Sequence, residues 1–178
     1  MKPQDLSLDE ICQRMSNFDL CNEISRVVEE RYGYDLLITW PESVPLSHRL
    51  VDFVWNTTGY LENEGFARFF NLVCNHSAYP ECFDIIGLSS LAADVRKSLK
   101  LFPKGDLGNT DALISHFGSW EQIEKLADAT ESELYSKSDD IEAALANYIR
   151  NHKHEFESFV PEIRKQRAYI KLIGGKTD

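Results

Sequence analysis

Apolar residues recur along this chain at the spacing of a helix rather than a strand. Stripes with separations of three or four positions run through residues 5–32, 46–62, 89–101 and 139–156. Residues at these separations lie on one face of an α-helix, where they can pack against a common core. The pattern therefore predicts an all-α fold.

Turn residues between the stripes divide the chain into parts. Residues 36–40 are rich in β-formers but have no partner strand, so we interpret them as a connector on the core. The expected fold is a single compact multi-helix domain of seven to nine helices with an N-terminal helical extension. Its parts are residues 1–45, the N-terminal helices and connector packed on the core; residues 46–158, the helical core; and residues 159–178, a C-terminal helix and a frayed tail.

Three sequence signals for helix starts lie close together after residue 118. Each pairs Ser, Thr or Asp with Glu or Gln three positions later, which is the capping-box pattern. The pairs are Ser119 with Gln122, Thr130 with Glu133, and Asp139 with Glu142. They predict three helix starts, with a break at Thr130 and a long last helix from about Asp139 to Phe156.

An aromatic run follows a short turn in residues 63–71, Asn-Glu-Gly-Phe-Ala-Arg-Phe-Phe-Asn. We expect one helix to end near Asn63 and the next to run from about Gly65 to Cys74, since glycine permits a positive φ or a close helix approach. The residues that share one face of this second helix are Phe66, Phe69, Phe70 and Val73. The positions expected to be buried in the whole fold are Trp55, Phe66, Phe69, Phe70, Ile86, Leu99, Leu145 and Ile149.

Composition narrows the class of protein. The 178 residues are 43% hydrophobic and 27% charged, which suits one globular domain. The net charge of −10 argues against direct nucleic-acid binding, and it fits either a basic partner or simply good solubility. No signal peptide is visible and no apolar run reaches the about 18 residues of a membrane span, so we expect a cytoplasmic protein with reduced cysteines and no membrane contact.

Charge is distributed unevenly along the chain. Residues 111–142 hold nine acidic and two basic side chains, a net of −7, whereas residues 143–178 have a net of +3. The carboxylates that we expect to meet a partner are Glu121, Glu124, Asp128, Glu131, Glu133, Asp139 and Asp140. On a continuous helix the first four share a face. An ordinary explanation stays open, because carboxylates in the first turn of a helix also stabilise it through the helix dipole.

The sequence holds no recognisable catalytic or cofactor motif. It lacks G-x-S-x-G, the P-loop and G-x-G-x-x-G, and we expect no cofactor. Cys74, His76 and Cys82 could ligate zinc, but their spacing fits no zinc motif, so we expect no metal. A polar cleft containing His76, His116 or Cys74 would favour an enzyme, and a convex acidic face would favour a binding protein.

Residues 63–71 resemble the motif of the bacterial DNA-mimic protein family. The matching residues are Asn63, Gly65, Phe66, Phe69, Phe70 and Asn71, while Glu64 replaces a glycine and Arg68 a glutamine. Similar fragments follow at Ile86-Gly87, at Leu101-Phe102-Pro103 and in the spacing of Tyr148, His152 and Phe156. The resemblance covers about residues 48–156. It implies an all-α fold and, for the best-known members, an acidic protein that occupies the DNA-binding surface of a transcription regulator.

Two classes of function stay open. The first is an acidic protein-interaction domain with a basic protein as partner. It would act either as a DNA mimic bound to a transcription regulator or as an immunity-type inhibitor of a basic toxin nuclease. The second is a small hydrolase or transferase with a site in the helical core. A homodimer is compatible with the sequence, which does not set the oligomeric state.

Overall fold

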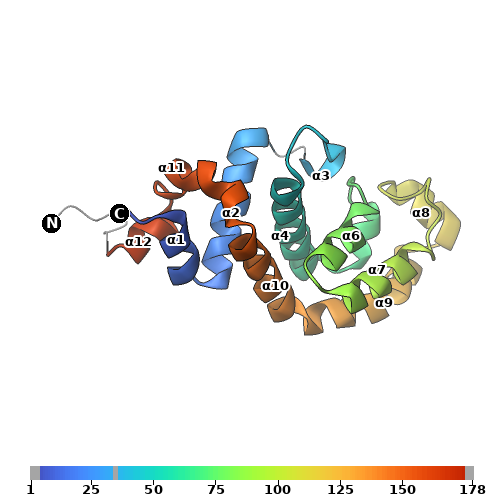
Figure 1. Cartoon of the computed structure of the whole chain (residues 1–178). Coiled ribbons are helices and arrows are strands. Elements are labelled where there is room, and N and C mark those ends of the chain that lie inside the picture. The colour runs from blue at the N-terminus through green and yellow to red at the C-terminus, as the bar shows by residue number, and fades with distance from the viewer. Residues whose placement is uncertain (1–4, 34–35, 175–178) are drawn as a thin grey trace.

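The computed structural model describes residues 5–33 and 36–174, and within them the chain is helical, with no strand (Figure 1). The elements are α1 (Leu8–Arg14), α2 (Asn17–Tyr32), α3 (Leu36–Thr39), α4 (Leu46–Glu64), α5 (Ala67–Asn71), α6 (Ala78–Ile85), α7 (Ser89–Leu99), α8 (Thr110–Phe117), α9 (Trp120–Ser136), α10 (Ser138–Asn151), the 3₁₀ helix η1 (Lys153–Phe159), α11 (Val160–Ile163) and α12 (Arg167–Leu172). The buried apolar side chains form one cluster from Leu6 to Tyr169. The predicted all-α fold in a single domain is therefore confirmed.

The number of helical segments depends on how the short ones are treated. In the described part of the chain, eight α-helices have seven residues or more, which agrees with the predicted seven to nine. The others, α3, α5, α11 and α12, have four to six residues. Helix α3 packs against α4, with Leu36 buried, so this segment forms a helical turn despite its content of β-formers.

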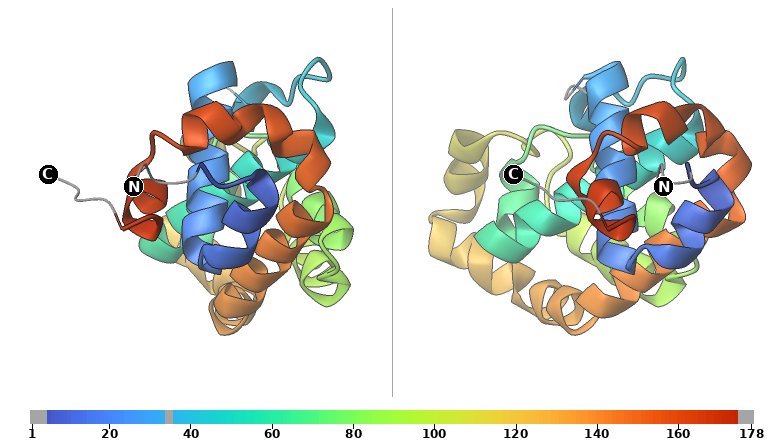
Figure 2. Two further views of the ribbon diagram at one scale, coloured as in Figure 1. Left: turned by 60° about the vertical axis from the view of Figure 1, so that its left-hand side comes forward. Right: turned by 90° about the vertical axis from the view of Figure 1, so that its left-hand side faces the viewer.

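Helix α4 lies at the centre of the domain (Figures 1 and 2). It packs against α2, α10, α6 and α3. Its apolar side chains are buried on several faces, as Leu50, Phe53 and Val54 show. A helix that is apolar on several faces is typical of a core position. Helices α1 and α2 contribute to the same core, because Ile11, in α1, and Leu20, in α2, have no exposed surface.

The segment before α1 and the C-terminal helices pack together at one end of the molecule (Figure 1). The Leu6 amide donates a hydrogen bond of 3.1 Å to the Tyr169 hydroxyl, and Arg164 donates one of 2.8 Å to the Leu6 carbonyl. Arg150 donates to the Cys12 carbonyl at 2.9 Å. Basic residues of the C-terminal third therefore bind the N-terminal segments.

Of the three predicted helix starts, the one at Thr130 is wrong, and the one at about Asp139 lies within one residue of the observed start. Ser119 does cap α9, since its hydroxyl accepts a hydrogen bond from the Gln122 amide. Thr130, however, lies inside α9, where it is buried and hydrogen-bonded to the Ser98 hydroxyl of α7. Asp139 lies in the first turn of α10, which begins at Ser138. Helix α10 also ends at Asn151, and η1 carries the chain on to Phe159, so the predicted long helix is shorter.

The aromatic run forms part of the core, with one correction. Phe66, Phe69 and Phe70 have at most 1% of their surface exposed, and Leu145 and Ile149 are buried as predicted. Val73 is 57% exposed, because α5 ends at Asn71 and does not extend to Cys74. The residues predicted to be buried that are only half-buried at the edge of the core are Trp55, Ile86 and Leu99.

Candidate protein-binding surface

Helix α9 carries four carboxylates along one face, which we call the α9 row: Glu121, Glu124, Asp128 and Glu131. Because α9 is continuous through Thr130, the expected face is not divided. At 1.5 Å per residue, the row spans about 15 Å of helix axis. Glu121, Glu124 and Asp128 are exposed, whereas Glu131 is half-buried. The four carboxylates therefore share a helix face, as expected for a continuous helix, and the predicted break at Thr130 does not interrupt it.

Two further carboxylates join this row from the end of α4. Glu64 lines a pocket of about 300 Å³ together with all four members of the α9 row. Glu62, two residues earlier, accepts a hydrogen bond from the hydroxyl of Ser138 at the start of α10. Sequence reasoning missed both residues. The available signal was a pair of carboxylates in the last turn of a helix with no basic residue there.

The helix dipole explains some of these carboxylates but not others. Glu121 lies in the first turn of α9, and Asp139 and Asp140 lie in the first turn of α10, where negative charge stabilises a helix. Glu62 and Glu64 lie at the opposite, negative end of α4, where carboxylates are unfavourable. Residues that oppose a local preference are expected at functional sites. Glu62 and Glu64 are therefore the carboxylates that helix stability explains least.

Nearby cations neutralise only part of this surface. Lys125 pairs with Glu121 at 2.8 Å, and Lys137 with Asp140 at 3.6 Å. Arg68 lies over the Trp120 ring, 4.8 Å from its centroid. The carboxylates of this surface that have no ion pair with a described residue are Glu62, Glu64, Glu124, Asp128, Glu131, Glu133 and Asp139.

Glu131 differs from its neighbours because the fold uses it. One of its carboxylate oxygens accepts a hydrogen bond of 2.8 Å from the backbone amide of Phe66. This contact joins α9 to the turn between α4 and α5. Of the seven carboxylates expected to meet a partner, Glu131 is thus the one with a clear structural task.

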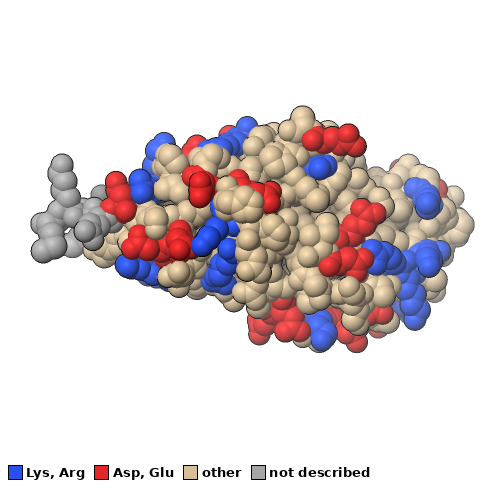
Figure 3. Space-filling model, viewed as in Figure 1, with Lys and Arg blue, Asp and Glu red and all other residues tan. Residues whose placement is uncertain are grey.

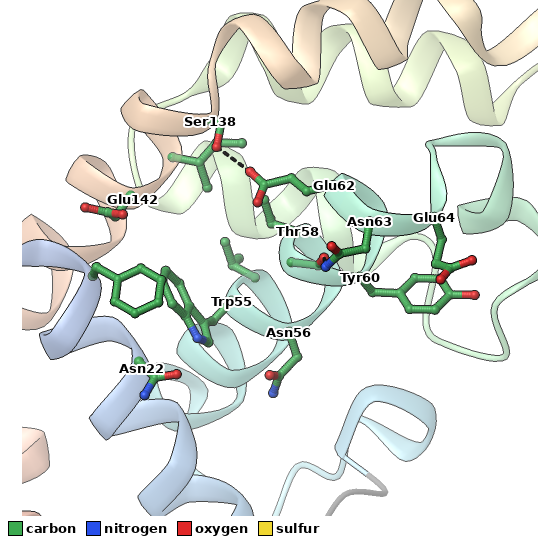
Figure 4. A pocket seen from close by; sticks show the side chains of 14 residues that line it. Asn22, Trp55, Asn56, Thr58, Tyr60, Glu62, Asn63, Glu64, Ser138 and Glu142 are labelled. Carbon is green, nitrogen blue, oxygen red and sulfur yellow. Dashed lines mark hydrogen bonds between the residues drawn. The ribbon is translucent and has the colours of Figure 1, made fainter. Parts of the chain in front are cut away.

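A larger pocket of about 790 Å³ lies beside the end of α4, between α2, α4 and α10 (Figure 4). We call it the Trp55 pocket. Its walls include the aromatic rings of Phe18, Trp55 and Tyr60. Its carboxylates are Glu62, Glu64 and Glu142. Because Glu64 lines both pockets, the two are neighbours, and we refer to the α9 row together with Glu62, Glu64 and Glu142 as the acidic track.

Carboxylates in and around the Trp55 pocket repel one another. Burial raises the pKa of the Glu142 carboxyl, and the nearby carboxylates of Asp139, Glu62 and Asp19 raise it further. Acidic side chains also gather over the junction of α9 and α10, along the lower edge of Figure 3, while basic ones gather at the right-hand end around α7. The surface charge is therefore uneven, but its basic end is formed around α7, which carries Arg96 and Lys97, and not by residues 143–178.

The structure does contain a cleft with Cys74 and His76, the feature expected to favour an enzyme. It has a volume of about 600 Å³. Burial raises the pKa of the Cys74 thiol to about 12, so the nucleophilic thiolate is scarce at neutral pH. Burial lowers the pKa of His76, whose Nε2 lies 2.7 Å from the Phe69 carbonyl oxygen and so donates to it. This cleft therefore lacks an activated nucleophile.

Neither His116 nor a group of metal-ligating side chains forms a catalytic site in the described residues. His116 is exposed and lies 3.8 Å from a carboxylate oxygen of Asp106, outside that cleft. Throughout the described residues, no three His, Cys, Asp or Glu side chains come together in an arrangement that could hold a metal ion. The four cysteines are free thiols. None of the described helices is long and apolar enough to cross a membrane.

The fold and the surface together define an all-α domain whose main chemical feature is a track of carboxylates from three helices. A comparison with known protein families shows which family the chain is related to. The sequence profile of the DMP19-like proteins matches residues 42–152. The match covers more than half of the chain, so the chain belongs to the DMP19-like family of DNA-mimic proteins. No curated protein and no solved structure matches it significantly.

Proposed function

We propose that this protein binds a DNA-binding regulator by presenting the acidic track to the regulator's basic surface, in the place that DNA would occupy. Membership of a DNA-mimic family supports a DNA-binding protein as the partner. One structural observation carries the assignment of the surface. Glu64, at the dipole-disfavoured end of α4, shares a pocket with the α9 row from a helix about sixty residues further along the chain.

The spacing of charges supports this proposal. Neighbouring members of the α9 row are three or four residues apart, which corresponds to about 4.5–6 Å along the helix axis. One strand of duplex DNA carries a charge about every 3.4 Å. A single helix face is therefore sparser than a DNA strand. Glu62, Glu64 and Glu142 add charge beside the row and bring the density of the track closer to that of a phosphate backbone.

The protein acts through binding and not through catalysis in this proposal, and it does not bind nucleic acid itself. A surface of like-charged carboxylates repels phosphates, whereas it attracts the lysines and arginines of a DNA-binding surface. Such complementarity raises the rate of encounter and determines which partners bind. Inhibition of a toxin nuclease would use the same attraction, but the family relationship favours a regulator.

The test is competition with DNA. Regulators captured by the immobilised protein from a host lysate at low salt would be purified and loaded with fluorescent operator DNA. We expect the protein to displace that DNA, and displacement to weaken strongly with salt, because the Debye length falls from about 10 Å at 0.1 M to about 3 Å at 1 M.

Two triple variants distinguish the acidic track from overall charge. The first combines Glu64→Gln, Glu124→Gln and Asp128→Asn, three exposed carboxylates of the track. The control combines Glu42→Gln, Glu81→Gln and Glu157→Gln, three exposed carboxylates outside it. Both change the net charge equally. We expect the first variant alone to lose displacement; equal displacement by both would show that the track is only a solvated surface.

A further inference from the structure

We infer that the Trp55 pocket receives an arginine side chain of the basic partner, so that it acts as an arginine-selective subsite beside the acidic track. This inference rests on the proposed function and deepens it. Carboxylates alone accept lysine and arginine alike. The pocket would therefore determine which basic side chain the partner must insert.

The walls of the pocket are aromatic and accessible. Phe18 is 55% exposed and Tyr60 is 39% exposed, so both rings are accessible from solvent. The rings of Phe18 and Trp55 meet edge to face, with centroids 5.3 Å apart. Figure 4 shows Trp55 between Glu142 at one end of the pocket and Tyr60 with Glu64 at the other. A side chain that enters the pocket thus meets aromatic rings with carboxylates on both sides.

The charge of the pocket is not neutralised from within. Its lining includes three carboxylates and no Lys or Arg. In the neighbouring pocket, by contrast, Arg68 and Lys125 stand among the carboxylates. A cation from another molecule would relieve the repulsion that Asp139, Glu62 and Asp19 exert on Glu142. The Trp55 pocket is therefore complementary to a positively charged group.

Elsewhere in this fold, arginine is the cation that lies on aromatic rings. Three pairs show it, with the guanidinium carbon 4.4–4.9 Å from the ring centroid: Arg31 over Phe159, Arg49 over Trp40, and Arg68 over Trp120. Arg31 also donates a hydrogen bond of 2.8 Å to Glu162, so ring and carboxylate act together. Among the described residues, no such cation lies over Trp55 or Tyr60.

Guanidinium chemistry fits this combination better than ammonium chemistry. The guanidinium group is planar, weakly hydrated and able to stack on a ring while its N–H groups bind a carboxylate, whereas the lysine ammonium is a compact, strongly hydrated charge. DNA-binding proteins offer such arginines, because arginine makes the commonest specific contact with guanine in the major groove. The pocket would thus bind a side chain that the partner otherwise inserts into DNA.

The experiment compares two peptides on the full protein, one with several arginines spaced by glycine and serine and the other with lysines at the same positions. Calorimetry would measure both affinities, and NMR would follow the indole N–H of Trp55, assigned with Trp55→Phe. We expect the arginine peptide to bind about three to ten times more tightly, the range that one cation–π contact provides. The Trp55 signal should shift more with the arginine peptide.

Paired variants test whether the preference for the arginine peptide arises in the Trp55 pocket. Phe18→Ala with Tyr60→Ala should abolish it, and the control Leu46→Ala with Leu101→Ala, two residues of similar exposure outside the pocket, should keep it. A second pair, Glu64→Gln with Glu142→Gln, leaves the rings in place and should weaken the arginine peptide more than the lysine peptide. Glu124→Gln with Asp128→Asn, in the α9 row, should weaken both peptides equally and leave the preference intact.

Several results would overturn the inference: no preference in the unmodified protein, no binding of either peptide, or a preference that survives Phe18→Ala with Tyr60→Ala. None of these results decides the proposed function, because displacement of DNA by the protein is measured without the peptides. If the protein displaces operator DNA but shows no arginine preference, the proposed role of the acidic track stands and the arginine subsite is ruled out.

Discussion

Glu131 of α9 accepts a hydrogen bond of 2.8 Å from the backbone amide of Phe66, sixty-five positions earlier in the chain. The bond satisfies an amide at the start of α5 and holds the turn after α4 against α9. The bond lies two residues after Glu64, the last residue of α4, which lines a pocket together with the α9 row. The geometry of the candidate surface therefore depends on one of its own carboxylates.

Loss of the Glu131 carboxylate should destabilise the fold. Glu131→Ala leaves the Phe66 amide without its partner, which costs about 1–3 kcal/mol. Glu131→Gln keeps an acceptor oxygen and should cost less than half as much. Urea denaturation measures both values, with Glu133→Ala as the control, since Glu133 is exposed on the same helix. Equal stability of Glu131→Ala and Glu133→Ala would contradict the structural role of Glu131.

Two glycines of the α4 region should respond to alanine in opposite directions. Gly65 has φ +84°, and an added Cβ would lie 3.4 Å from a Glu131 oxygen, so Gly65→Ala should cost about 1–2 kcal/mol. Gly59 lies inside α4 with no atom within 4 Å of an added Cβ, so Gly59→Ala should stabilise the protein by up to about 1 kcal/mol. Thermal unfolding of both variants measures whether Gly65→Ala lowers the melting temperature and Gly59→Ala raises it.

Truncation of Phe69 should be among the most destabilising substitutions in the core. Its ring has no exposed surface and contacts the rings of Phe66, Phe70, His76 and Tyr79. Phe69→Ala should therefore cost about 3–5 kcal/mol of unfolding free energy. Denaturant titration measures this cost. A loss below about 1 kcal/mol would mean that the aromatic cluster is not packed as described.

Stability should depend on pH through Asp52. Burial, assisted by the nearby Glu29 carboxylate and opposed by hydrogen bonds from Ser25 and Asn56, raises the pKa of its carboxyl from the usual 3.8 to about 7. The folded state thus holds the proton more tightly than the unfolded chain. Ionisation of Asp52 therefore destabilises the fold as pH rises from about 4 to about 7.

Asp52→Asn removes this ionisation and keeps an acceptor for Ser25 and Asn56. The stability of this variant relative to the unmodified protein should rise by about 2 kcal/mol between about pH 5.5 and pH 8, and then level off. Urea midpoints across this range provide the measurement. A difference that stays constant with pH would show that Asp52 does not titrate as its burial implies.

Charge reversal on the acidic track should act mainly on association. Once a regulator is available, changing Glu64, Glu124 and Asp128 to Lys should slow binding more than it speeds dissociation, because these exposed carboxylates attract the partner before contact. Stopped-flow kinetics at low and high salt separates the two rates. An unchanged association rate would place the interface elsewhere, first on α1 and α2.

The sequence by itself determined the fold class and much of the core. Helical spacing of apolar residues predicted an all-α domain, and the buried rings of Phe66, Phe69 and Phe70 follow directly from that spacing. The cap at Ser119 was equally visible, because a capping box is a contact between residues close in sequence. Such features are local, so a linear sequence contains the information that specifies them.

Tertiary structure decided what those local signals could not. Thr130 has the sequence of a helix cap, but α7 packs against α9 and Ser98 takes the Thr130 hydroxyl as a hydrogen-bond partner, so the helix continues. Only this packing makes the α9 row continuous. The meeting of Glu64 with that row and the Trp55 pocket likewise join residues far apart in the chain. No local propensity specifies such distances, because they arise when helices bury their apolar faces against one another.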